Sequence, residues 1–393
     1  QGSIDANNKL AAGHTYQKSA ATGNMWGALP LYYTDGTPTS YPRSANVGTD
    51  WSFQDATVNS TFAEWTHGFG NGWTGTATLT YNRSPNESEL FFVSGIQDRA
   101  TGLGLTSYTS AYDSIFKQKL ADGTVKGTID LGGRRHDLSF GASWSESEID
   151  SRSASGPDTG TSLPGNAAVD GSYPRPAFGA GVGAGGYTDK RKNAFVAARW
   201  NLADDWKLLT GANTVKVDTR GSSYGTSSYR SGSKTTPYAG LVYDINETLS
   251  AYASYSTIFN AQSEMDFDRQ LLAPVEGRTR EVGLKSDLLD GRLQLSGAVF
   301  KTRQTNSPEL AGYINGLDAF YVGVEAESQG VELELAGQLS KNWNASIGFT
   351  QMSMEGNEGQ DVRTFIPRKT LRTATTYRFA SMPQLKVGAS INW

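Results

Sequence analysis

The stretch from Thr235 to Asn306 decides the fold: TTPYAGLVYDINETLSAYASYSTIFNAQSEMDFDRQLLAPVEGRTREVGLKSDLLDGRLQLSGAVFKTRQTN. It contains two pairs of strand-like segments, joined by the short turns Ile245-Asn246-Glu247 and Leu289-Asp290-Gly291. A longer polar loop, Gln262 to Pro274, lies between the two pairs. Short turns that alternate with long loops indicate an antiparallel sheet whose strands are joined by tight turns at one end and by long loops at the other.

A two-residue period continues through the chain from Trp51 onward. In one segment the apolar parity reads Trp73, Gly75, Ala77, Leu79 and Tyr81. The positions between and after them, four threonines and Asn82, are all polar. Because successive side chains of a strand point to opposite faces, this pattern predicts strands with one apolar and one polar face.

Three features favour a membrane barrel over a soluble sandwich, which also alternates. The apolar parity often ends in an aromatic residue, the strands are long, and short and long connections alternate strictly. Short turns are expected at Asn71, Gly133, Asp204, Asn246, Asp290, Lys341 and Ser381. Longer connections are expected around 84–110, 151–190, 221–234, 262–276, 304–328 and 354–366. The fold class is therefore all-β, an antiparallel transmembrane β-barrel of about 14 strands.

The predicted domain organisation is simple. Residues 1–50 are polar and lack periodicity, so we expect an extracellular loop region that precedes the first strand. Residues 51–393 are expected to form one barrel domain. The absence of cysteine excludes disulfides and suits an outer membrane, and a net charge of −4 does not indicate a nucleic-acid partner.

Several segments resemble TonB-dependent siderophore receptors: PYAGLVYDINETLSAYASYSTIF, LLAPVEGRTREVGLKSDLLDGRLQLSGAVFKTRQTN, SQGVELELAGQLSKNWNASIGFTQM and FIPRKTLRTATTYRF. The upstream segments LPLYYTDGTPTSYPRS, FGNGWTGTATLTYN and DRATGLGLTSYTSAYDS are similar to the branch for ferric pyoverdine- or ferrioxamine-type siderophores. This resemblance implies energised uptake of a ferric siderophore across the bacterial outer membrane. It also implies the TonB-ExbB-ExbD complex as a partner, besides the siderophore and outer-membrane lipid.

The resemblance further implies that the chain is a fragment. Such receptors have an N-terminal plug inside a 22-stranded barrel. The chain would begin after about five barrel strands and stop before about three more. The segment from Leu385 to Trp393 alternates, but it follows the short turn at Ser381 and runs outward, so Trp393 is expected to be a truncation point.

Loop aromatics are the strongest candidates for ligand binding. Flat rings suit a siderophore chromophore or hydroxamate backbone, and two arginines are suited to its anionic oxygens. The candidate residues are Trp26, Tyr32, Tyr33, Tyr41, Arg43, Trp51, Arg99 and Tyr108. The alternative is that these rings only pack the loops together.

No other chemistry is indicated. His14, His67 and His136 are scattered, so no protein metal site or cofactor is expected, and the iron arrives chelated by the siderophore. Glu332 and Glu334 share one strand face, where lining a wet lumen is favoured over a glycosidase pair, so the chain is not expected to be an enzyme. The alternative functions are a passive porin of about 14 strands and, third, a secreted carbohydrate-binding or adhesin β protein.

Overall fold

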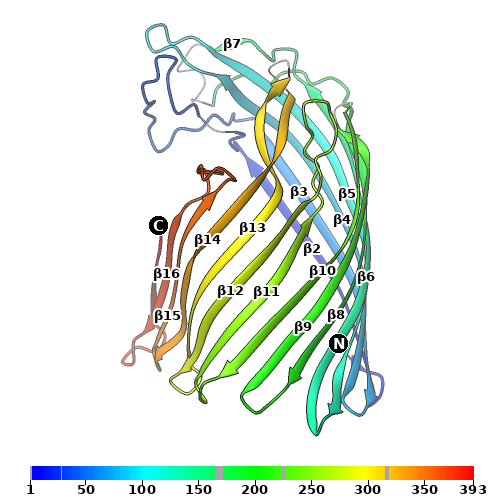
Figure 1. The fold of residues 1–393 in the computed structure, drawn as a ribbon. Coiled ribbons are helices and arrows are strands. Elements are labelled where there is room, and N and C mark those ends of the chain that lie inside the picture. Colours follow the sequence, from blue (N-terminus) through cyan, green and yellow to red (C-terminus); the bar gives the residue numbers. More distant parts are fainter. Residues whose placement is uncertain (1, 28, 164–170, 224–225, 315–317) are drawn as a thin grey trace.

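The computed structural model describes residues 2–27, 29–163, 171–223, 226–314 and 318–393. These residues form seventeen antiparallel strands and no helix (Figure 1). Accordingly, the described residues contain no helix with the length and apolar character needed to cross a membrane.

The strands follow one another along the chain with long, regular segments. Their bounds are β1 (Gly2–Ser3), β2 (Asn8–Thr22), β3 (Phe53–Gly70), β4 (Trp73–Gly95), β5 (Leu105–Leu131), β6 (Arg134–Ser155), β7 (Ser162–Leu163), β8 (Val182–Asn201), β9 (Trp206–Ser223), β10 (Thr226–Asp244), β11 (Leu249–Asn260), β12 (Val275–Leu288), β13 (Leu293–Ile314), β14 (Asp318–Ser340), β15 (Trp343–Glu355), β16 (Lys369–Arg378) and β17 (Lys386–Asn392).

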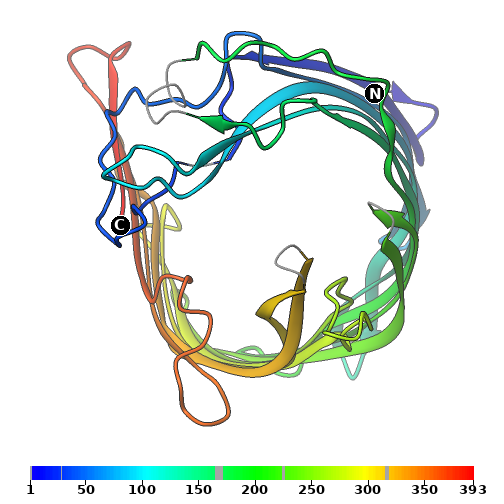
Figure 2. The same cartoon turned by 90° about the horizontal axis from the view of Figure 1, so that it is seen from above.

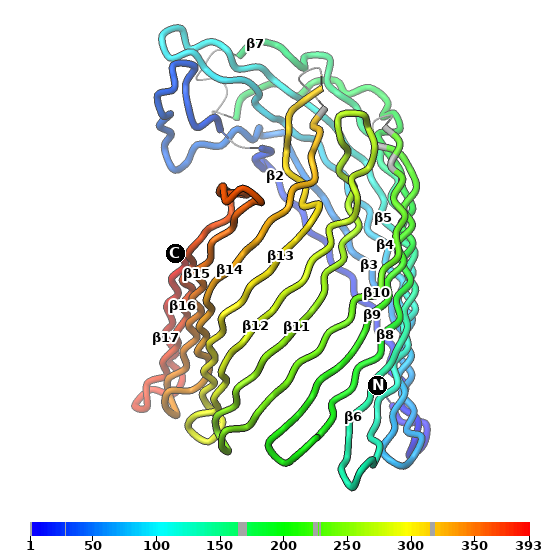
Figure 3. The backbone as a smooth tube through the Cα atoms, viewed as in Figure 1, coloured from blue at the N-terminus to red at the C-terminus, as the bar shows by residue number. Residues whose placement is uncertain are grey.

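The topology is an up-and-down meander. Each long strand pairs with the next, and β6 pairs directly with β8 because the two-residue β7 lies on the edge of β5. Within the described residues, β2 and β17 are not paired with each other, so the sheet curves around a central space without closing (Figure 2). Figure 3 shows the short turns at one end of this wall and most of the long connections at the other.

The ladder register gives the wall two distinct faces, because directly opposed residues of an antiparallel pair lie on the same face. One row across the sheet runs through Leu208, Leu241, Ala253, Val282 and Val299. This face is apolar yet uncovered: Leu79 is 63% exposed and Val282 is 58% exposed. We call it the outer face, since uncovered apolar side chains in continuous rows are the signature of a lipid-facing barrel wall.

The seven predicted short turns are all confirmed. They connect β3 to β4, β5 to β6, β8 to β9, β10 to β11, β12 to β13, β14 to β15 and β16 to β17. Turn chemistry explains the tightest of them. Asn71, Leu289 and Asp290 have positive φ values of 42°, 53° and 58°, and Asn and Asp tolerate this region better than most residues.

Two expectations are wrong. Residues 1–50 are not one loop region, because β2 occupies Asn8–Thr22 and pairs with β3 along its whole length. It adds one strand to the fourteen that the seven hairpins supply. The connections predicted at 84–110, 221–234 and 304–328 are also largely strand, because these hairpins continue as paired ladders past the apolar band.

Candidate functional site

The loop from residue 23 to residue 52 links β2 to β3 and lies against the extended β4–β5 hairpin (Figure 3). Both ends of the loop are fixed by backbone hydrogen bonds. The amide of Gly23 donates to the Ser52 carbonyl at 2.8 Å, and the amide of Asp50 donates to the Gly171 carbonyl at 3.2 Å. The connections that follow β2 and β6 are thereby held together over one side of the barrel mouth.

Four aromatic rings meet on one face of the β4–β5 hairpin. The Trp26 ring centroid lies 6.0 Å from that of Phe92, 5.6 Å from that of Tyr108 and 5.7 Å from that of Tyr112. Phe92 and Tyr108 are direct register partners, and their parity is that of the polar threonines lower in β4. This inner-face cluster, Trp26, Phe92, Tyr108 and Tyr112, therefore lies on the lumenal side of the hairpin.

Gly27 allows Trp26 to reach this position. Its φ of +85° is a left-handed conformation that glycine adopts without steric cost. A Cβ at this position would lie 2.2 Å from an edge carbon of the Phe92 ring. Only glycine lets the backbone pass this close to the cluster. Tyr108 remains 37% exposed, so the cluster presents an accessible aromatic surface toward the mouth.

The opposite face of the same hairpin carries a closed hydrophobic core. Its buried members are Val47, Phe91, Val93, Leu105 and Leu163, with Leu29, Trp51 and Tyr173 packed against them. Phe91 stacks on Tyr173 with ring centroids 4.6 Å apart, and the Trp51 indole N–H donates to the Tyr173 carbonyl at 2.7 Å. Burial raises the pKa of the Tyr173 phenol. We call this set the outer-loop core; Trp51 packs the loops together within it.

The other candidate aromatics lie on a small hairpin within the 23–52 loop. Tyr32 forms an isolated β-bridge with Pro38, and the amide of Tyr33 donates to the Thr37 carbonyl at 2.9 Å. The hairpin contacts the β4–β5 connection, where the Thr34 amide donates to the Gln97 carbonyl at 3.0 Å. Tyr32 is exposed and Tyr33 half-buried, so only the first presents most of its ring to solvent.

The two candidate arginines are exposed. The Thr37 hydroxyl holds the pKa of Asp35 below its usual range, and the positive charge of Arg99 adds to this effect. Arg99 thus faces a carboxylate of the neighbouring loop. Arg43 follows the half-buried Tyr41 by two residues, further along the 23–52 loop. The described residues show no ring contact between Trp26 and Tyr32, Tyr33 or Tyr41, so the predicted set is not one pocket.

The β4–β5 connection is braced by Asp98. Its carboxylate accepts hydrogen bonds from the Thr101 amide at 2.7 Å and from the Thr101 hydroxyl at 2.8 Å. The Ala100 amide donates to the same oxygen at 3.0 Å. These donors, the Thr101 amide first, hold the pKa of the Asp98 carboxyl below its usual range. The hydrogen bonds to the Asp98 carboxylate therefore stabilise the conformation of the connection that contains Arg99.

The histidine and glutamate side chains considered in the sequence lie on the strands of the barrel wall. Within the described part of the chain, no three His, Cys, Asp or Glu side chains group as metal ligands would. His14 contacts the Thr61 hydroxyl at 2.8 Å. Glu332 and Glu334 lie on the polar face of β14, where Tyr252 donates a hydrogen bond to Glu281 on the same lumenal surface.

Residues 2–393 match the family model described as TonB dependent receptor-like, beta-barrel. The chain belongs to the TonB-dependent receptor family. This receptor barrel is an outer-membrane structure, and the match supports neither the porin nor the adhesin alternative.

Among curated relatives, the barrel is 29% identical to the ferripyoverdine receptor of Pseudomonas aeruginosa over 409 residues, covering 99% of this chain and 49% of that protein. It is 30% identical to the ferric-pyoverdine BN7/BN8 receptor of Pseudomonas putida over 399 residues, covering 98% and 49%. The solved ferripyoverdine receptor of P. aeruginosa, bound to ferripyoverdine, superposes with a TM-score of 0.88 at 28% identity, over 99% of this chain and 53% of that one.

The chain thus spans about half the length of the curated relatives it matches. Those relatives are transport receptors rather than enzymes.

Phe92 and Tyr112 complete the inner-face cluster but were not among the residues singled out from the sequence. Their parity along the β4–β5 ladder, which they share with Tyr108, is the signal that could have found them, but the sequence alone predicts a connection around 84–110, which contains Phe92 and Tyr108.

Proposed function

We propose that this receptor barrel forms the wall and outer loops of a transporter that imports a ferric siderophore of the pyoverdine class. Iron enters as chelated cargo, and the TonB-ExbB-ExbD complex supplies the energy through the remainder of the receptor. The named specificity of the two curated relatives supports this substrate class. The inner-face cluster at the barrel mouth is the observation that supports a specific binding site for this ligand.

The cluster has the chemistry that such a ligand requires. Aromatic rings offer a large contact area at low entropic cost, and the exposed part of Tyr108 lies on the lumenal side. Arg43 and Arg99 lie on adjoining loops, where each contributes positive charge for a chelator rich in anionic oxygens. Tyr32 adds an exposed ring on the small hairpin of the 23–52 loop. Trp51 stabilises the arrangement from the outer-loop core.

The test is tryptophan-fluorescence quenching of the full-length receptor by ferripyoverdine, followed by the Trp26→Ala variant. A central aromatic contact contributes about 2 kcal/mol, so the Kd is expected to rise about thirty-fold. The control is Trp343→Ala, which removes an exposed indole from the other end of the wall. Absence of saturable quenching by any siderophore would refute import. An unchanged Kd in Trp26→Ala would place the ligand elsewhere.

A further inference from the structure

The outer face of β9 to β13 changes from apolar to basic within two rows of side chains. The apolar row contains Leu208, Leu241, Ala253, Val282 and Val299. The next row toward the long-loop end contains Ala239, Tyr255, Arg280 and Lys301. The row after that contains Thr257, Arg278 and Arg303. Two arginines of β12 thus oppose two further cations of β13.

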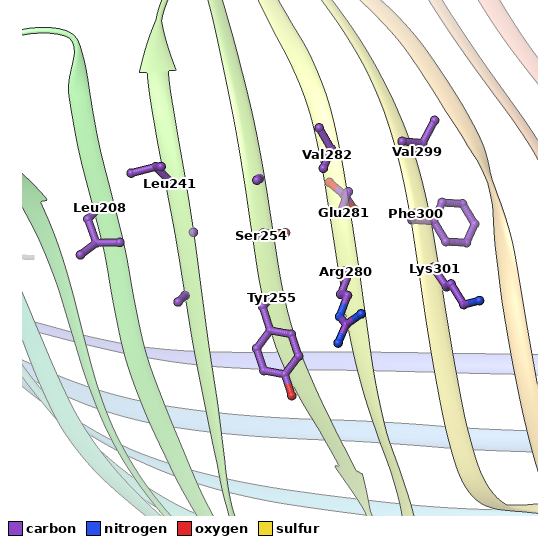
Figure 4. Close-up of a pocket in the computed structure, with 13 residues that line it drawn as sticks. Leu208, Leu241, Ser254, Tyr255, Arg280, Glu281, Val282, Val299, Phe300 and Lys301 are labelled. Carbon is purple, nitrogen blue, oxygen red and sulfur yellow. The ribbon is translucent and has the colours of Figure 1, made fainter.

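The apolar rows include a shallow groove of about 600 Å³. It exists because the small Ala253 lies between the larger Leu241 and Val282 in one row, and the small Ala239 is opposite Tyr255 in the next. Figure 4 shows Leu241, Val282 and Tyr255 around the groove. Arg280 and Lys301 line the same groove toward the basic rows. The groove is therefore amphiphilic: apolar along its floor and cationic at its outer margin.

The margin coincides with the expected boundary of the outer leaflet. Arg280 lies nine residues before Leu289 in the β12–β13 turn. At about 3.3 Å per residue and a tilt of about 45°, this places it about 21 Å from the short-turn end along the membrane normal. The apolar band of such barrels is about 25 Å tall. Tyr255, beside Arg280, occupies the position of an aromatic-girdle residue.

The described part of the protein balances only two of the four positive charges at this margin. Lys301 pairs with Glu327 at 2.5 Å, and Arg303 pairs with Glu325 at 2.5 Å. No ion pair within the described part of the chain involves Arg278 or Arg280, although both are exposed. Each is directly opposite another cation, Arg303 and Lys301 respectively, and like charges opposed across a ladder destabilise it. A bound anion would remove this repulsion.

We propose that this outer-face site binds a phosphate-bearing lipid of the outer leaflet. One acyl chain lies in the groove over Ala239 and Ala253, and the headgroup phosphate lies against Arg278 and Arg280. The guanidinium fork matches phosphate oxygens bidentately, and the lipid-facing position selects an amphiphile over a dissolved anion. Tyr255 lies at the junction between chain and headgroup, where an amphipathic ring is favourable.

The first test is native mass spectrometry of the full-length receptor in detergent, titrated with dioleoyl phosphatidic acid or dioleoyl phosphatidylcholine. Preferential binding of phosphatidic acid is expected, and the Arg278→Gln, Arg280→Gln double variant should lose it. At about 1 kcal/mol per basic residue near an anionic headgroup, the Kd should rise about thirty-fold. The charge-matched control, Arg292→Gln with Arg378→Gln, lies near the short turns and should bind as the wild type does.

The second test separates lipid from free anion. Ala253→Phe fills the groove without changing charge, so it should weaken phosphatidic acid binding and leave the affinity for inorganic phosphate unchanged. A native heat-dependent gel shift of each variant verifies that the barrel is intact. Equal binding of both lipids, wild-type affinity in the double arginine variant, or inorganic phosphate binding as tightly as phosphatidic acid would each overturn the proposal.

Discussion

Replacing Phe91 by alanine is predicted to release the outer loops while the barrel wall remains folded. Phe91 is 1% exposed and stacks on Tyr173 within the outer-loop core. Truncation of a buried phenylalanine costs about 3–5 kcal/mol, and the lost ring pair adds about 0.5–1.5 kcal/mol. Local opening of a loop requires less free energy than global unfolding, so a loss of this size removes most of the loop order.

Hydrogen–deuterium exchange of the full-length receptor measures this effect. The amides of Gly23 and Asp50, which are hydrogen-bonded to Ser52 and Gly171, should lose protection in Phe91→Ala. The β12–β15 ladders should keep theirs, because none of the described residues that form the outer-loop core belongs to these strands. Phe62→Ala is the matched control, since that ring is 39% exposed in the wall. Unchanged protection at both amides, or uniform loss over the whole barrel, would refute the reasoning.

Three further predictions concern separate features. Gly27→Ala places an alanine in the left-handed region, which costs about 1 kcal/mol, and brings its Cβ against the Phe92 ring. Trp26 should then leave the cluster, and its emission maximum should shift to the red. An unshifted spectrum would contradict the close approach of Gly27 to Phe92. Because its folded pKa is depressed below the ordinary value near 3.8, Asp98 stabilises the β4–β5 connection above that pH, and this contribution is lost as the pH falls through the folded pKa. Limited proteolysis of this connection should therefore rise below about pH 4, and Asp98→Asn should show the acid-state rate at neutral pH. Asp189→Ala leaves Arg191 and Arg230 without their shared carboxylate, and should lower the temperature of the heat-dependent gel shift by more than Asp130→Ala does, since the Asp130 pair is exposed. Equal shifts in the two variants would argue against the Asp189 network.

The sequence predicts the wall better than the loops because the wall obeys a local rule. Alternation along each strand depends only on neighbours within the segment, and the turns after Asn71 and Asp290 use residues suited to positive φ. β2 is the exception. Its outer positions include His14 and Lys18, and its inner positions include Ala11, so its period is weak. Fifteen register partners in β3, rather than its own pattern, make it a strand.

The candidate site depended on contacts that no local pattern encodes. Trp26 and Tyr108 were both identified as loop aromatics, but their meeting requires the 23–52 loop to fold back over the β4–β5 hairpin. The sequence also placed Trp51 in the same class, although it packs beside Phe91 on the opposite face. Parity along β4 separates the two groups once the hairpin is known to continue through residues 84–95.

The two-faced β4–β5 hairpin has a consequence for how such a receptor can change its cargo. Even-numbered positions such as Phe92 and Tyr108 face the lumen, while odd-numbered positions such as Phe91 and Val93 hold the loops in place. Substitutions at the first set can reshape the mouth without loosening the second. Specificity and loop stability are thus carried by alternate residues of one hairpin, and each can vary while the other is kept.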